Sequence, residues 1–296
     1  MTAFSYLLMY FYFYSFLGWI WESSYVSICQ RKWTNRGFLT GPMLPIYGSG
    51  AVVMLCTTYP VRSSLLGLFF VGMLGATLLE YVTGVVMEAL FQVRYWDYSN
   101  QKFNFQGHIC LSSSLAWGAF TILLVRIVHP HVSELLSYIP SAICFVLLMI
   151  TTILFCIDLI TSFYAAMDLR HVLEATTKLK VDADKLREHL AALSDSVSET
   201  LHEKLDAVKK PEGYHWDAFQ NSITEHFEKL SSLIPKEKAE DLIRLKERLS
   251  YLSESKNIIT KRMDPKKILL LKGNPTLTSS KYSNALNALK DYFIKK

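Results

Sequence analysis

Long hydrophobic stretches in the first 166 residues constrain the fold of this chain more than any other feature. A helix needs roughly 20 apolar residues to cross a bilayer. Five stretches approach or exceed that length: 4–27, 43–59, 64–91, 109–128 and 139–166. The first is too long and too aromatic for a cleavable signal peptide, so we expect it to remain in the mature protein. The sequence therefore predicts an all-α, polytopic membrane bundle of about five transmembrane helices over residues 1–166.

Most charged residues follow this region. Of the 31 Lys and Arg and the 26 Asp and Glu, residues 167–296 hold 24 and 20. This near balance does not favour nucleic acid as a partner, and attraction to anionic lipid headgroups is a sufficient explanation for the basic excess. We expect residues 167–296 to form a cytoplasmic α-helical domain.

Basic residues in the loops predict the orientation. Arg31, Lys32 and Arg36 follow the first stretch, Arg94 and Lys102 follow the third, and the Lys-rich tail follows the fifth. Such residues concentrate on the cytoplasmic side of membrane proteins. The sequence therefore predicts a multi-pass protein of the cell membrane, with its amino terminus outside and its tail in the cytoplasm.

The stretch 43–59 leaves this topology open. It is short and opens with a segment rich in glycine and proline, GPMLPIYGSG. Such a helix can be re-entrant where protein or a water-filled cavity surrounds it. The alternative topology then has four crossings, with both termini inside.

The tail shows helical patterns of its own. Apolar residues recur in a heptad-like pattern along a predicted first helix, 168–208, which favours a coiled coil and a homodimer through this helix. The alternative is an amphipathic helix that packs on its own tail. Asp264 and Pro265 predict a later helix start, and a last helix is expected from about Ser280.

Two glutamates interrupt the third hydrophobic stretch. A carboxylate in mid-membrane costs roughly 2.5–3.5 kcal/mol. Glu80 and Glu88 recur with Ala76 and Gly84 at every fourth position, which places all four on one helix face. Because small residues let a neighbouring helix approach closely, we expect this face to be packed and turned away from lipid.

Further polar residues in or beside the stretches complete a candidate site. The predicted substrate-binding residues are Glu22, Asn35, Arg36, Tyr47, Glu80, Glu88, Arg94, Asp97, His108 and Asp158. They would surround a polar cavity that binds a cation or a polar headgroup. In the alternative interpretation, the glutamates pair with Arg36, Arg94 or Asn35 and only fix the helix packing.

The sequence does not identify catalytic residues and favours a protein that is not an enzyme, and neither a cofactor nor a metal site is expected. The P-loop pattern G-x-x-x-x-G-K-[ST] and the zinc pattern H-E-x-x-H do not occur in the sequence. None of the five cysteines has C-x-x-C spacing, so we expect them to be small buried residues.

Several motifs resemble a known family. YSFLGWIWESSY (14–25), NRGFLTGPMLPIYGSGA (35–51), LLEYVTGVVMEALFQVRYWDYS (78–99), FNFQGHICLSSSLAWG (103–118) and DPKKILLLKGNPTLTSSKYSNALNALK (264–290) are similar to the bacterial CmpB-like, type IV family of ABC-transporter permeases. The motif positions in this sequence are Gly18, Glu22, Asn35, Arg36, Gly37, Gly41, Pro42, Pro45, Tyr47, Gly48, Glu80, Gly84, Glu88, Arg94, Trp96, Asp97, Tyr98, Asn104, Gly107 and Trp117.

The resemblance implies a transport component in the lipid bilayer that works with a separate cytoplasmic ATPase subunit. Two other functions stay open. One is a membrane scaffold whose polar residues are structural. The other is a membrane enzyme for lipid-linked substrates, with Glu80 or Asp97 as general base and Arg36 or Arg94 as phosphate clamp.

Overall fold

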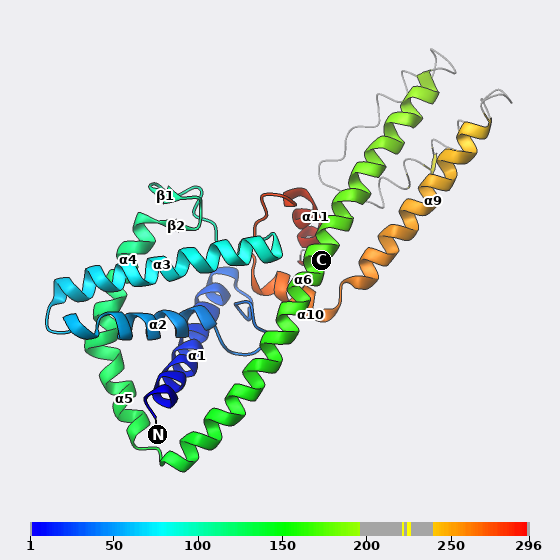
Figure 1. Cartoon of the computed structure of the whole chain (residues 1–296). Coiled ribbons are helices and arrows are strands. Elements are labelled where there is room, and N and C mark those ends of the chain that lie inside the picture. Colours follow the sequence, from blue (N-terminus) through cyan, green and yellow to red (C-terminus); the bar gives the residue numbers. More distant parts are fainter. Residues whose placement is uncertain (1, 196–220, 222–223, 226–238, 295–296) are drawn as a thin grey trace. The chain divides into compact units, whose positions relative to one another are not determined.

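The computed structural model describes residues 2–195, 221, 224–225 and 239–294 of the 296-residue chain (Figure 1). The chain divides into two compact units. The first holds Met1–Asp168 and Pro265–Lys281, and the second holds Leu169–Asp264 and Tyr282–Lys296. The segment Pro265–Lys281, which follows the charged tail helices in sequence, thus belongs to the same unit as the hydrophobic helices.

Four helical runs among the described residues are long and apolar enough to cross a membrane. They are α1 (Ala3–Gln30), α3 (Leu65–Phe91), the run Leu111–Ser137, and the hydrophobic part of α6 (Ser141–Asp195). The run Leu111–Ser137 comprises α4 (Leu111–Leu123), the π-helical turn η2 (Leu124–Val128) and α5 (His129–Ser137). The predicted all-α fold class is confirmed.

The predicted stretch 43–59 forms a shorter helix. It is α2 (Pro45–Thr57), which the 3₁₀ turn η1 (Tyr59–Val61) follows. Pro45 suits the first helical position because an N–H there would have no partner within the helix. At 1.5 Å per residue, the 13 residues of α2 extend about 20 Å, whereas a hydrocarbon core is about 30 Å thick.

One end of the first unit brings together the start of α1, the start of α3 and the region of α5. Tyr10 Oη of α1 lies 3.1 Å from Ser133 Oγ of α5. Arg126 Nη2 donates to the carbonyl of Ser63, just before α3, over 3.1 Å. The chain therefore enters α1 and α3 from the same end.

The opposite end, here called the polar end, comprises loop 31–44, segment 92–110 and residues 265–281. Arg36 donates to the Tyr95 carbonyl (3.3 Å) and to Asn274 Oδ1 (2.8 Å), which joins all three parts. Because α1 and α3 both run toward this end, α2 must carry the chain back between them. A small antiparallel pair, β1 (Asn104–Phe105) and β2 (Ile109–Cys110), lies within segment 92–110.

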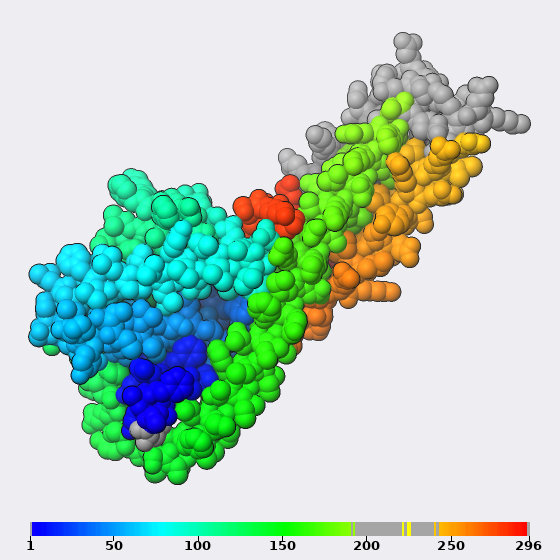
Figure 2. All heavy atoms as spheres, viewed as in Figure 1, coloured from blue at the N-terminus to red at the C-terminus, as the bar shows by residue number. Residues whose placement is uncertain are grey.

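The two faces of α3 differ sharply. Its outer face exposes large apolar side chains at every fourth position: Leu66, Phe70, Leu74, Leu78, Val82 and Val86. Figure 2 shows α3 (cyan) exposed at the surface of the first unit. Its buried face carries Leu68, Gly72, Ala76, Glu80 and Gly84. This confirms the prediction that Glu80 lies on the packed face.

The second unit contains the later part of α6, α9 (Ala239–Arg262) and α11 (Ser283–Ile294). Buried residues of α6 recur at the heptad spacing: Val172, Leu179, Leu186, with Ala183 and Leu190. Arg248 Nη1 of α9 lies 3.2 Å from His189 Nδ1 of α6, so these helices lie side by side. Residues 196–208 of the predicted first tail helix lie outside the described residues. The helix α10 (Pro265–Gly273) begins at Pro265, as predicted.

Candidate functional site

A cavity of about 400 Å³ lies at the polar end of the first unit, with walls from α1, α2, α3, α4 and α6. This volume is within the range of small-molecule sites. Four predicted site residues line it: Glu22, Arg36, Tyr47 and Glu80. Besides Tyr47, seven aromatic residues line it: Phe38, Phe91, Tyr95, Trp96, Tyr98, Trp117 and Phe163. We call it the first cavity.

Glu22 reaches the first cavity because α1 and α2 pack closely. Gly18 lies one turn before Glu22, and a methyl group there would collide with the Tyr47 ring. This close approach lets Tyr47 Oη donate to Glu22 Oε1 over 2.7 Å. The other oxygen, Oε2, lies 3.7 Å from Arg36 Nε. Glu22 thus has a neutral donor and a cation as partners.

Arg36 is fixed from several sides. Its guanidinium donates to Asn274 Oδ1 (2.8 Å), the Tyr95 carbonyl (3.3 Å) and Thr276 Oγ1 (3.3 Å). Burial lowers the pKa of Arg36, and the nearby Glu22 carboxylate partly offsets that effect. The guanidinium stays cationic, because arginine is not deprotonated in proteins.

Glu80 differs from Glu22 in having only neutral partners. Its side chain is buried, with 5% of the residue exposed. Tyr98 Oη and Trp117 Nε1 each donate to it over 3.0 Å, and Ser113 Oγ over 3.4 Å. In the described part of the chain, its carboxylate forms no ion pair within 4.0 Å. Because a buried carboxylate without a cation is costly, Glu80 is suited to bind a proton or a cation.

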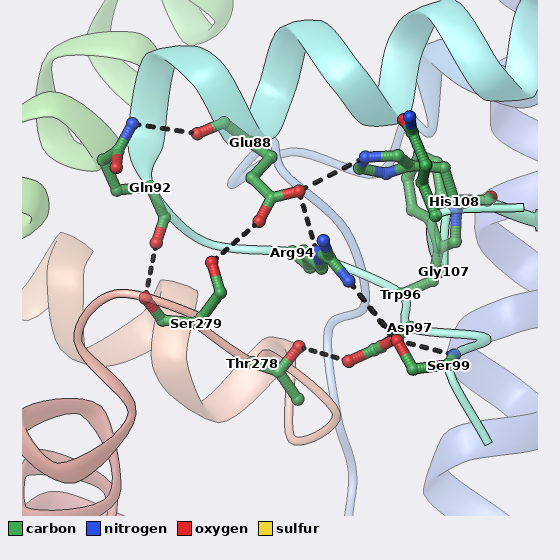
Figure 3. A network of polar contacts seen from close by, with 12 residues as sticks. Glu88, Gln92, Arg94, Trp96, Asp97, Ser99, Gly107, His108, Thr278 and Ser279 are labelled. Atoms are coloured by element: carbon green, nitrogen blue, oxygen red, sulfur yellow. Dashed lines mark hydrogen bonds and ion pairs between the residues drawn. The ribbon is translucent and has the colours of Figure 1, made fainter.

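A second polar group, the Glu88 cluster, comprises Glu88, Arg94, Asp97 and His108 (Figure 3). Arg94 Nε lies 2.7 Å from Glu88 Oε2, and His108 Nε2 lies 3.2 Å from the same oxygen. Arg94 Nη1 lies 3.6 Å from Asp97 Oδ1. This cluster does not line the first cavity. Each of its carboxylates has a cationic partner.

Two turns of the backbone assemble the Glu88 cluster. Gln92 ends α3 in the left-handed conformation, with φ of 59°, which turns the chain so that Arg94 meets Glu88. Gly107 has φ of +73°, which favours glycine. A side chain at this position would also collide with Ser99 and Arg94.

The cluster shifts two pKa values downward. Burial raises the pKa of Asp97, but hydrogen bonds from Ser99 and Thr278 and the charge of Arg94 outweigh it and hold the pKa below its ordinary value. For His108, burial and the nearby Arg94 lower the pKa, against the opposing effect of Glu88 and Asp97. His108 is therefore neutral at pH 7, and Asp97 is ionised.

A C-terminal strap, residues 274–281, covers the Glu88 cluster (Figure 3). Arg94 and Thr278 exchange backbone hydrogen bonds of 2.8 and 3.0 Å. Thr278 Oγ1 donates to Asp97 (3.1 Å), and Ser280 Oγ donates to Glu88 (3.1 Å). Ser279 Oγ donates to the carbonyl of Gln92 over 2.6 Å. The strap thus satisfies the remaining acceptors of the cluster.

The two remaining predicted residues hold loop 31–44 in place. Asp158 of α6 accepts hydrogen bonds from the backbone N–H groups of Thr40 (3.2 Å) and Gly41 (2.8 Å). Asn35 accepts from Trp19 Nε1 (2.5 Å) and donates to the Thr40 carbonyl (2.6 Å). Neither side chain lines the first cavity.

The ten predicted residues thus separate into three groups rather than one site. Sequence reasoning did not include the donors to Glu80, which are Tyr98, Ser113 and Trp117, or the strap. Tyr98 and Trp117 are motif positions of the family resemblance, and this signal could have identified them. Among the described residues, no group of three or more histidine, cysteine, aspartate or glutamate side chains is arranged to hold a metal ion.

Comparison with known proteins gives one match. No curated protein and no solved structure matches the chain. The sequence profile of one family matches residues 9–163, just over half of the 296 residues. The matched region contains the first cavity's acidic residues and the Glu88 cluster. The chain belongs to the family described as "putative ABC-transporter type IV".

Proposed function

We propose that this protein is a membrane transport component whose first cavity binds an organic cation. The observation that carries the proposal is the buried Glu80 carboxylate, which has three neutral donors and no cationic partner among the described residues. Membership of an ABC-transporter family supports the transport role.

The charges of the first cavity favour a positive ligand. Arg36 balances Glu22, from which it lies 3.7 Å away. Glu80 then leaves one negative charge in a site with mostly apolar and aromatic walls. Ionisable groups within a membrane protein commonly mark an ion or substrate pathway. A cation at Glu80 would offset the cost of burying this charge.

The aromatic walls suit a quaternary ammonium group in particular. Aromatic faces attract cations, and cages of such rings recognise quaternary ammonium ligands. Tyr98 and Trp117 lie close to the glutamate, since both bond directly to Glu80, and Trp96 lines the same cavity. A weakly hydrated cation of this type loses less hydration on entering the cavity than a compact ammonium does.

We place the polar end at the cytoplasmic face. It carries Arg31, Lys32, Lys102, Lys266 and Lys272, whereas Arg62 and Arg126 lie toward the other end. This distribution agrees with the positive-inside rule. Because α1 and α3 run parallel, α2 completes a crossing despite its length, which favours five crossings over four. If ATP hydrolysis drives transport, a separate cytoplasmic ATPase subunit would carry it out.

A scaffold role is the second candidate, and the Glu88 cluster favours it. There the acidic groups pair with Arg94 and His108 and with the strap, as structural residues do. This argument does not extend to Glu80, which has no such cation. The two proposals therefore differ in what Glu80 does.

Equilibrium dialysis of the purified full-length protein against labelled tetramethylammonium tests the proposal. We expect saturable binding to the wild type and its loss in Glu80→Gln. Glu134→Gln is the matched control, because Glu134 is exposed on α5, where its carboxylate accepts a hydrogen bond from Tyr138, one turn away. Equal binding by all three proteins, or none by the wild type, would refute the proposed function.

A further inference from the structure

A second cavity, of about 530 Å³, lies beside the first and has no use in the function proposed above. Residues of α1, α2, α4 and η2 line it, and nearly all are apolar or aromatic. None of the described residues that line it is acidic or basic. Its chemistry is therefore that of a site for a hydrocarbon group.

Gly50 of α2 marks the free space in this cavity. The residue is buried, yet a Cβ added to it would meet no atom within 4 Å. Gly48 on the same helix is different, because a Cβ there would collide with Ser15 and Phe11 of α1. The helix thus packs tightly at Gly48 and leaves room at Gly50.

The second cavity opens on the apolar surface of the unit. Ile20 and Trp21 of α1 and Phe120 and Leu123 of α4 line it and are also exposed. These residues lie in helices long and apolar enough to cross a membrane. A hydrocarbon chain in the bilayer could therefore enter the cavity from the side.

Two aromatic residues separate the cavities. Tyr47 and Trp117 line both, and their ring centroids lie 6.3 Å apart at an interplanar angle of 68°. Tyr47 donates to Glu22, and Trp117 donates to Glu80. Each carboxylate of the first cavity thus holds one ring of the partition, so a ligand that binds these carboxylates directly affects the partition.

We propose that the two cavities together bind a cationic amphiphile, with its ammonium group in the first cavity and a single alkyl chain in the second. This inference rests on the proposed function and adds the class of cargo. The cavities share two wall residues, one cavity is acidic and aromatic, and the other is apolar. A ligand that fills both must combine a positive head with a hydrocarbon chain. Displacement of Tyr47 or Trp117 from its carboxylate would join the two spaces.

Photocrosslinking in lipid nanodiscs tests this assignment. The probe is an alkyltrimethylammonium with a diazirine in the middle of a twelve-carbon chain, and peptide mass spectrometry locates the label. We expect labelling at residues of the second cavity, such as Met54 and Leu123, and competition by the same compound without the diazirine. Labelling confined to lipid-facing positions such as Leu154 of α6, without competition, would overturn the proposal.

Two variants sharpen the test. Gly50→Leu fills the second cavity where the structure has free space, so we expect loss of the competable label at Met54 and Leu123. Ala119→Leu introduces the same side chain, with one added carbon fewer, on the exposed side of α4, and its labelling should match the wild type. Undiminished labelling in Gly50→Leu would contradict the assignment of the ligand's alkyl chain to the second cavity.

Binding of tetramethylammonium distinguishes a failure of this inference from a failure of the proposed function on which it rests. If the wild type binds tetramethylammonium and Glu80→Gln does not, the proposed cation site is supported. The photocrosslinking result then decides whether the alkyl chain lies in the second cavity. If the wild type fails to bind tetramethylammonium, the proposed function itself is wrong. Competable labelling at Met54 would then indicate a plain alkyl-chain site and overturn the amphiphile assignment.

Discussion

Glu80 and Glu88 lie on the same side of α3, eight residues apart, but their surroundings differ in charge. Glu88 meets Arg94 and His108 and accepts a hydrogen bond from Ser280. Glu80 meets three neutral donors and lines a cavity. Two glutamates on one helix thus have different surroundings and can have different roles. A carboxylate that is paired with a cation fixes the fold, whereas we propose that one with only neutral partners among the described residues, beside a cavity, binds a ligand.

The largest expected effect is a difference in labelling between the two ends of the bundle. The loops that contact Glu80 and Glu88 lie at the polar end, which we place in the cytoplasm. With single cysteines at Lys32, Lys102 and Lys281 in a cysteine-free background, an impermeant maleimide should label all three positions only from the cytoplasm. A cysteine at Arg62 should react only from outside. All four positions are exposed.

Labelling of position 62 from the cytoplasm would favour the re-entrant alternative for α2. Labelling of positions 32 and 102 from opposite sides would invalidate the comparison of Glu80 with Glu88. Loop 31–44 and segment 92–110 would then not lie at the same end of the bundle.

The next largest effect should come from Arg94→Gln, which removes the main partner of Glu88. Loss of one partner of a buried ion pair costs roughly 3–5 kcal/mol. Since the two side chains are 18% and 20% exposed, we expect a smaller loss of unfolding free energy, about 2–3 kcal/mol. Thermal unfolding of the purified protein measures it. Addition of Glu88→Gln should restore most of the loss, and a double variant no better than Arg94→Gln would argue against the pairing.

A smaller loss of stability is expected from Asn274→Ala. Asn274 connects the strap to the first cavity. Asn274 accepts from Arg36 and donates to the carbonyls of Gly37 and Leu270. An unsatisfied buried polar group costs roughly 1–3 kcal/mol, so we expect Asn274→Ala to lower the unfolding free energy by about 1–2 kcal/mol. Asn284→Ala, at an exposed position, is the control. Equal stability of both variants would show that the strap contributes nothing at this point.

The smallest effect should be the pH dependence of the Glu88 cluster. The pKa of His108 is below its ordinary value in the folded protein, so the unfolded chain binds more protons just below pH 6.5. Stability should therefore fall as pH decreases from 7.5 to 5. Asp97, whose pKa is also lowered, should lose its contribution only below about pH 4. His108→Gln should reduce the slope of melting temperature against pH. An unchanged slope would assign the dependence to other groups.

The sequence predicted the elements better than the contacts between them. Hydrophobic length identified the helices, and the four-residue spacing of Ala76, Glu80 and Gly84 identified the packed face of α3, because both signals are local. The pairing of Arg94 with Thr278 joins positions far apart in the chain, and no periodicity encodes it. The donors to Glu80 come from segment 92–110 and α4; the family resemblance points to Tyr98 and Trp117 as motif positions, but no local pattern pairs them or Ser113 with Glu80. For the same reason Asp158, an acid in a membrane helix, was grouped with the site although it holds loop 31–44.

The central claim is that Glu80 binds a cation and Glu88 does not. The most direct test is the melting temperature of wild type, Glu80→Gln and Glu88→Gln, each with and without saturating tetramethylammonium. We predict that Glu80→Gln is as stable as the wild type or more stable, because a costly charge is removed, and that it gains nothing from the ligand. Glu88→Gln should be less stable, because Arg94 loses its partner, but should still gain from the ligand as the wild type does. A ligand-induced rise in Glu80→Gln equal to that of the wild type would contradict the account.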